Sequence, residues 1–407
     1  MDKLSNDLRH PSADWLLQHD SDYPVGPTAL QVGGLTLLCD YDCRLDDHNG
    51  KAMLCQKMKL FRKAGAAVFS GEGAFPGAGG STTLRQTIRY AANHARITSD
   101  WHWHRGGLIQ DACEQGSFFL PGTWRKVFLF PAPADLEQGQ TPGWQALPEN
   151  GVLEFSPLPL LLICANDSGQ QLEFGLGDDL WRSIQGLVPQ ARQILRLTNS
   201  RRGLLCQRCI AVAGADQPPL QPEAREYRFT SYLAWSAPAL VRPAPDPHRY
   251  RPLSFTASGE LVRQELLACG DCPSLSLDFR TLPLPRQARR SGDGEICWES
   301  KVTQKYVRRI IRQLADYAPQ GALLISGGMS PGLCLDGVHC SRRGPTPHWD
   351  LLAILDVSTW MRQRLGEQWE IDILQPEPWQ SLVSLSCLGA SNGFRLLEDR
   401  DDDEEEE

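Results

Sequence analysis

One stretch of the chain concentrates side chains able to transfer protons. It reads RITSDWHWHRGG and sets Asp100, His102 and His104 at intervals of two residues. In a β-strand, side chains two apart lie on the same face, so these three predict one titratable face. Imidazole changes its protonation near neutral pH, and a neighbouring carboxylate can orient the ring. The pattern predicts a general acid–base site in which His102 or His104 moves the proton and Asp100 orients the imidazole.

Arginine and tryptophan side chains surround this stretch and predict the substrate-binding part of the site. Residues 84–95 have both helical and strand spacing, but their β-branched and aromatic residues favour a strand. Guanidinium groups can bracket the hydroxyls of a sugar while indole rings cover its apolar face, although burial of these indoles in a core is the alternative. The residues assigned to substrate binding are Arg85, Arg89, Arg96, Trp101, Trp103 and Trp181.

Other residues have the chemistry of zinc ligands, and zinc is the cofactor that these patterns suggest. His102 and His104, with Asp100, also fit a His-X-His metal site on a strand. Two CxxC pairs predict either a structural zinc or buried core cysteines, and they comprise Cys206, Cys209, Cys269 and Cys272. A region closer to the C-terminus offers ligands for a metal-dependent hydrolase, namely His339, His348 and Asp350.

Composition and charge narrow the class of protein. The formal net charge is −8, and the segment Glu398–Glu407 alone holds nine acidic residues and one arginine, so the rest of the chain is close to neutral. A neutral body argues against nonspecific nucleic-acid binding, which needs a basic surface. No apolar run approaches the roughly 20 residues of a membrane helix, and the N-terminus has no signal-peptide core. With 13 cysteines, an odd number, the sequence predicts a cytoplasmic protein without a membrane partner.

The order of apolar runs predicts a mixed fold, an N-terminal antiparallel β-sandwich followed by a smaller α/β domain. Short apolar runs separated by Gly, Pro and Asn fill the first part and are typical of an all-β sandwich. Later, Glu299–Tyr317 has a single apolar stripe at helical spacing and alternates with strand-like runs. The expected boundaries are a polar lead-in over 1–27, the sandwich over 28–237, a proline-rich linker over 238–257, the α/β domain over 258–395 and a disordered acidic tail over 396–407.

Two segments, Ile97–Gly107 and Gln171–Arg182, carry alternating Arg, His, Asp and Trp residues. In this respect residues 28–237 resemble the galactose-mutarotase-like β-supersandwich proteins. The resemblance implies a sandwich that handles sugars, as the epimerases and polysaccharide lyases of that group do.

These observations lead to one leading hypothesis and two alternatives. The leading hypothesis is a protein that binds or processes a carbohydrate in an epimerase- or lyase-like acid–base cleft. One alternative is the metal-dependent hydrolase, and the other is a non-catalytic scaffold with a structural zinc. Whether the chain is an enzyme stays open at this point.

Overall fold

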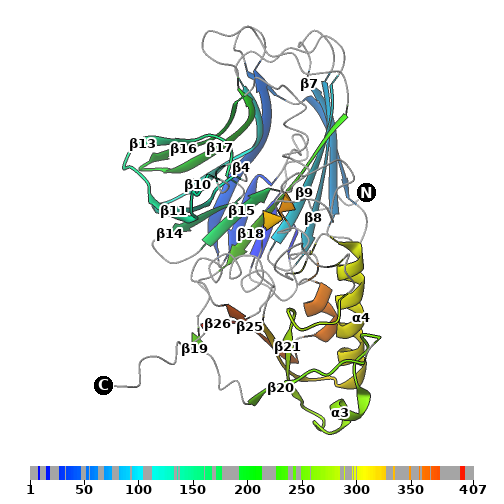
Figure 1. Ribbon diagram of the computed structural model, residues 1–407. Coiled ribbons are helices and arrows are strands. Elements are labelled where there is room, and N and C mark those ends of the chain that lie inside the picture. Colours follow the sequence, from blue (N-terminus) through cyan, green and yellow to red (C-terminus); the bar gives the residue numbers. More distant parts are fainter. Residues whose placement is uncertain are drawn as a thin grey trace, which may run out of the picture. The chain divides into compact units, whose positions relative to one another are not determined.

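The computed structural model in Figure 1 describes a large part of the chain. The described residues are 8–9, 15–18, 27–32, 34–46, 52–54, 56–62, 68–75, 82–91, 94–103, 112–132, 135, 138–159, 161–166, 171–176, 192–212, 226–236, 242–243, 249–256, 258–284, 288, 296, 298, 300–326, 333–334, 348–349, 357, 360–366, 368–375 and 395–398. The chain divides into two compact units, Met1–Leu233 and Ala234–Glu407.

The first unit contains two antiparallel sheets, each with nine strands among the described residues. The first sheet has the order β1-β2-β3-β4-β10-β17-β16-β13, with β5 paired to β4. Its strands are β1 (Leu8–Arg9), β2 (Trp15–Gln18), β3 (Ala29–Val32), β4 (Leu35–Asp46), β5 (Ala52–Leu54), β10 (Ala112–Pro121), β13 (Gly151–Phe155), β16 (Arg192–Ser200) and β17 (Gly203–Val212).

The second sheet has the order β12-β11-β14-β15-β18-β9-β8-β7-β6. Its strands are β6 (Gln56–Arg62), β7 (Val68–Phe75), β8 (Thr82–Ala91), β9 (His94–His102), β11 (Trp124–Phe130), β12 (Gly143–Ala146), β14 (Leu161–Asn166), β15 (Gln171–Leu176) and β18 (Glu226–Ser236). The prediction of a strand rather than a helix before residue 95 is confirmed by β8.

Aromatic side chains join the two sheets into a sandwich. Phe118 of the first sheet lies 5.5 Å, between ring centroids, from Phe174 of the second, and it also stacks on Tyr41. Strand β16 shows the underlying pattern, because its buried and less buried residues largely alternate. Each sheet therefore turns one apolar face inward, as the sequence predicted.

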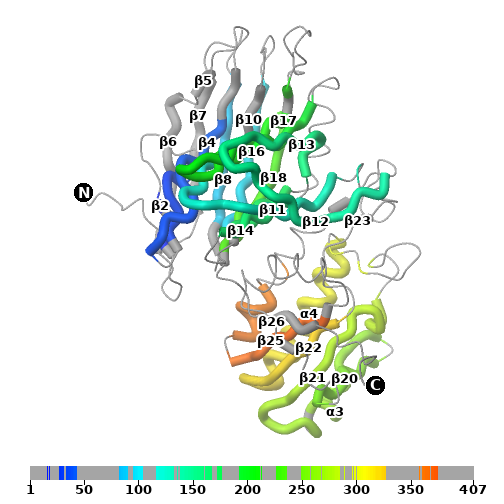
Figure 2. Tube along the Cα trace, turned by 90° about the vertical axis from the view of Figure 1, so that its left-hand side faces the viewer, coloured from blue at the N-terminus to red at the C-terminus, as the bar shows by residue number. Residues whose placement is uncertain are grey.

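The second unit is an α/β domain built on a six-stranded sheet of parallel pairs, as counted within the described residues, with the order β19-β26-β25-β22-β21-β20. Figure 2 shows several of these strands side by side. They are β19 (Arg242–Pro243), β20 (Arg251–Pro252), β21 (Ser274–Asp278), β22 (Gly321–Ser326), β25 (Trp369–Gln375) and β26 (Arg395–Glu398). The unit also contains α3 (Arg263–Leu267), α4 (Lys301–Tyr317) and the short pair β23 (Leu333–Cys334) and β24 (His348–Trp349).

Helix α4 follows directly from its sequence. Ser300 caps its N-terminus by accepting a hydrogen bond from the backbone N–H of Thr303, at 3.4 Å. Its buried stripe includes Tyr306, Ile310 and Leu314, so the helix predicted over 299–317 is confirmed. No helix in the described part of the chain is both long and apolar enough to cross a membrane.

The mixed fold class is confirmed, but three expected boundaries need correction. Strands β1 and β2 belong to the first sheet, so the segment 1–27 is not merely a lead-in. Strands β19 and β20 fall within the expected linker 238–257 and pair in the second unit's sheet. Strand β26 extends to Glu398, two residues past the start of the expected tail, and the residues after it lie outside the described part. Backbone pairing between strands, which composition does not reveal, decided all three.

Candidate functional site

Strand β9 has the two faces that its sequence predicts. Its odd-numbered residues, Ile97, Ser99 and Trp101 among them, are buried, whereas Asp100 and His102 are partly exposed. The period of two in a strand produces this separation. His104 and Trp181 lie outside the described residues, so their predicted roles remain predictions.

Strand β8 adds the predicted arginines to the exposed side of β9. The two strands are antiparallel, and Arg85 is directly opposite Asp100 while Arg89 is opposite Arg96. Residues directly opposite in an antiparallel pair have their side chains on the same face. Arg85 and Arg89 are exposed, so the structure brings all three predicted arginines onto the side of the sheet that carries Asp100 and His102.

Strand β18 supplies two residues that the sequence did not identify. The Arg228 guanidinium donates from Nε to Asp100 Oδ1 at 2.6 Å, and Glu226 Oε1 lies 3.5 Å from His102 Nδ1. The carboxylate next to the imidazole is therefore that of Glu226. Asp100, the predicted orienting group, instead binds Arg228. We call this set the polar face, and it consists of Arg85, Arg89, Arg96, Asp100, His102, Glu226 and Arg228.

A buried carboxylate lies further along the same side of the sheet. Two and four residues beyond Arg228, β18 carries Thr230 and Tyr232, and the Tyr232 hydroxyl donates a hydrogen bond to Glu173 of the neighbouring strand β15. Both partners are buried. A Cβ on Gly175 would overlap the Tyr232 ring, so the glycine makes room for this pair. The side of the sheet that carries the polar face thus continues into a region shielded from water.

Trp101 of β9 and Trp103, which directly follows β9, do not have the position that a sugar platform requires. Trp101 and Trp103 are each only 1% exposed, and their rings stack on each other with centroids 6.1 Å apart. They point away from the polar face because they occupy the odd positions of the strand. Their assignment to substrate binding is therefore wrong, and both are core residues.

The cysteine pair of β17 cannot act as one zinc-binding unit. Cys206 and Cys209 pair in regular register with β16 and are three residues apart, so their side chains point to opposite faces of the strand. Both are buried. Burial, together with the neighbouring Cys164 thiol, raises the pKa of Cys206 well above its ordinary value, which keeps this thiol protonated. The structure favours the core interpretation for these two residues.

The remaining predicted ligands do not gather in the described structure. The Cys269 thiol donates to the backbone oxygen of Glu265 at 3.3 Å, and Cys272 is exposed. No group of three or more His, Cys, Asp or Glu residues able to hold a metal ion occurs among the residues that the structure describes. His339 and Asp350 lie outside those residues, and His348 is described only as the backbone of β24.

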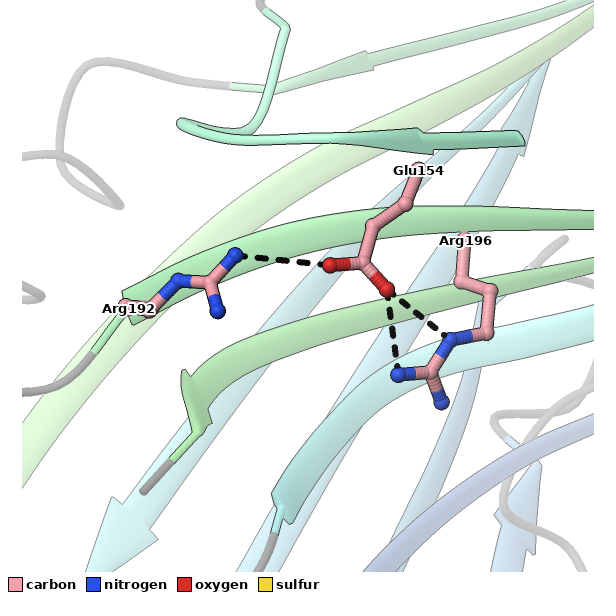
Figure 3. A network of polar contacts seen from close by, with 3 residues as sticks. All are labelled: Glu154, Arg192 and Arg196. Atoms are coloured by element: carbon pink, nitrogen blue, oxygen red, sulfur yellow. Dashed lines mark hydrogen bonds and ion pairs between the residues drawn. The ribbon is translucent and has the colours of Figure 1, made fainter. Parts of the chain in front are cut away.

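A second carboxylate held by arginines occurs on the first sheet. Figure 3 shows Glu154 of β13 between Arg192, at 3.4 Å, and Arg196, at 3.2 Å, both from β16. The three side chains are partly exposed, like those of the polar face. This network has charges similar to those of the polar face but no histidine, so it offers a natural comparison for an acid–base role.

A separate pocket of about 390 Å³ lies where strands of both sheets of the first unit end. Asn199 forms part of its wall and donates hydrogen bonds to the backbone oxygens of Trp124 and Pro148. Glu149 and Arg125 also line it. No sequence pattern predicts this pocket, because its walls come from turns far apart along the chain.

Comparison with known proteins gives only distant likenesses. No protein-family model and no curated protein matches the chain. Among solved structures, a candidate aldose 1-epimerase from Escherichia coli K12 is 8% identical and aligns over 57% of this chain and 98% of its own, with a TM-score of 0.38. A protein from Synechocystis sp. PCC 6803 is 11% identical and aligns over 57% of this chain and 95% of its own, also with a TM-score of 0.38.

An α-galactosidase from Geobacillus stearothermophilus is 12% identical over 91% of this chain and 65% of its own, at a TM-score of 0.36. A candidate aldose 1-epimerase is thus among the structures that align with this chain. Likeness at this level transfers neither fold nor activity to the chain.

Proposed function

We propose that the polar face binds a carbohydrate and transfers protons on it, with His102 as the acid–base residue. One observation carries the proposal, namely that β9 and β18 place an imidazole–carboxylate pair and a guanidinium–carboxylate pair on the same side of one sheet. An imidazole with a carboxylate at Nδ1 presents its Nε2 to a substrate, and the carboxylate stabilises the imidazolium once it forms.

The charges of the polar face favour an acidic sugar. It holds four arginines against the two carboxylates of Asp100 and Glu226, so it retains positive charge. Guanidinium groups bind carboxylates in a bidentate manner and also donate to hydroxyls. A uronate-type sugar therefore fits this surface better than a neutral one, and a base positioned near its carboxylate could remove the adjacent carbon-bound proton, as an epimerase or a lyase requires.

The first experiment measures binding and turnover with a panel of neutral sugars and uronates. Binding is followed by calorimetry, and epimerisation or elimination is followed by NMR of the sugar protons. We expect saturable binding of at least one uronate, weakened by Arg85→Met. We also expect His102→Asn to lower the rate by about 10²- to 10⁴-fold, the range for losing a general acid or base, while changing binding little.

Glu154→Gln is the matched control, because it neutralises an arginine-flanked carboxylate on the other sheet, and it should alter neither binding nor rate. Glu226→Gln should lower the rate and leave substrate affinity nearly unchanged. Absence of binding to every sugar in the panel would refute the proposal. Binding without turnover would retain the carbohydrate site and remove the acid–base role of His102.

A further inference from the structure

Helix α4 of the second unit has a strongly basic surface. Its 17 residues include five basic side chains and one acidic one, Asp316. We call the basic set the basic face, and it consists of Lys301, Lys305, Arg308, Arg309 and Arg312. With Val302 and Tyr306, four of these residues line an open groove of about 540 Å³. The groove therefore combines positive charge with some apolar surface, since Val302 is 43% exposed.

The basic face has no counter-charge within the described part of the chain. No carboxylate there forms an ion pair with any of its five residues, and Asp316 pairs with Arg364 instead. Arg308 and Arg312 both lie 5.6 Å from the Trp360 ring, and Arg309 donates to the backbone oxygen of Gly259. These contacts hold the guanidinium groups in place but leave their charges uncompensated. Like charges this close on one helix repel each other, so an anionic partner would stabilise the surface.

The chain itself contains a segment of matching charge. Glu398–Glu407 holds nine acidic residues and one arginine, and it begins at the last residue of β26. Strands β21, β22, β25 and β26 are parallel, so their carboxyl ends meet at one edge of the sheet. Helix α4 connects β21 to β22 in the chain, and a connection between adjacent parallel strands must start at that edge. The acidic segment therefore leaves the sheet at the edge where α4 begins.

The distances permit contact within one chain. Three strand spacings separate β26 from β21 in the sheet order, or about 14 Å at the usual interstrand spacing. The nine residues after Glu398 can span up to about 30 Å when extended. The basic face itself is about 16 Å long, given the rise of an α-helix. An extended acidic segment can thus reach Lys301 and follow the helix toward Arg312.

We infer that the acidic segment Glu398–Glu407 docks on the basic face of α4 in the same chain, and so competes with any polyanionic partner for that groove. A carbodiimide, which joins lysine amines to nearby carboxylates, tests this on the full chain at low salt, with the products mapped by mass spectrometry. We expect Lys301 and Lys305 to link to the acidic segment with about tenfold higher yield than Lys126, since docking would hold the carboxylates of the segment beside these two amines and not beside Lys126. Lys126 is an exposed lysine of the first unit.

Two variations of the cross-linking experiment, in salt concentration and in the charge at Lys305, test whether electrostatic attraction causes the docking. The excess yield should disappear at about 1 M salt, where the Debye length is about 3 Å. Lys305→Glu should lower the yield at Lys301, whereas Lys305→Arg, which keeps the charge, should preserve it. An equal mixture of isotopically labelled and unlabelled chains separates docking within a chain from docking between copies. Links found only between copies, a yield no higher than that of Lys126, or a yield insensitive to salt would each overturn the inference.

Discussion

Gly116 of β10 is a position where a single added methyl group should lower the stability of the first unit markedly. The glycine has φ +69° and lies against two buried side chains, Tyr41 and Arg208. A Cβ there would overlap Arg208 Nη2 and Tyr41 Oη and lie 2.8 Å from Tyr41 Cζ. Arg208 cannot easily yield, because its Nε donates to the Gly116 oxygen at 3.3 Å and its guanidinium lies 3.5 Å from the Phe174 ring centroid.

The expected cost of Gly116→Ala has two parts. A left-handed backbone costs a residue with a Cβ about 1–2 kcal/mol, and overpacking a filled core costs about 1–3 kcal/mol. We therefore expect Gly116→Ala to lower the free energy of unfolding of the first unit by about 2–5 kcal/mol. Gly122→Ala isolates the first part, because Gly122 has φ +95° and no atom within 4 Å of the position that a Cβ would occupy.

Hydrogen exchange of peptides from β10 and β17 gives the assay, since it reports opening of the sandwich separately from the second unit. Tyr41→Phe removes one of the two overlapping atoms, so combining it with Gly116→Ala should recover part of the loss, a coupling of about 0.5–3 kcal/mol. A cost of Gly116→Ala no greater than that of Gly122→Ala, or no recovery with Tyr41→Phe, would refute overpacking as the cause.

Three further predictions concern the core and the thiols. Burial raises the pKa of Tyr41 above that of an unfolded tyrosine, so its stabilising contribution is present below about pH 10 and is lost as pH rises above that value. The free energy of unfolding, measured with urea between pH 8 and 11, should therefore decline less in the Tyr41→Phe variant than in the unsubstituted protein. Equal declines in the two proteins would contradict the assignment. Burial and the neighbouring Asp40 carboxylate raise the pKa of Cys39 to about 11, and the thiolate is the form that reacts with iodoacetamide. At pH 8, iodoacetamide should therefore label the exposed Cys272 well before Cys39, and peptide mass spectrometry measures the two labelling rates. Trp101→Ala should destabilise the sandwich by about 3–5 kcal/mol because it empties a buried site; a stable variant that has lost only sugar binding would instead restore the platform role.

The sequence by itself determined the local features of this protein. Alternation in RITSDWHW separated the Asp100 and His102 face from the Trp101 face, because a strand's side chains alternate whatever their neighbours are. The apolar stripe and Ser300 cap likewise predicted α4, since both signals lie within a few residues of each other. Alternation does not tell which of the two faces meets the core, and for this reason the prediction of a sugar platform at the tryptophans is wrong.

Only the tertiary structure decided which side chains meet. Glu226 and Arg228 are more than 100 residues from His102 and Asp100, and strand order alone brings β18 beside β9. The same holds for Arg208, a buried guanidinium whose pKa burial lowers to about 10. Its partners Gly116 and Phe174 belong to other strands of the sandwich. Pairing between distant strands depends on the packing of the whole sandwich, and the sequence pattern of one strand does not contain that information.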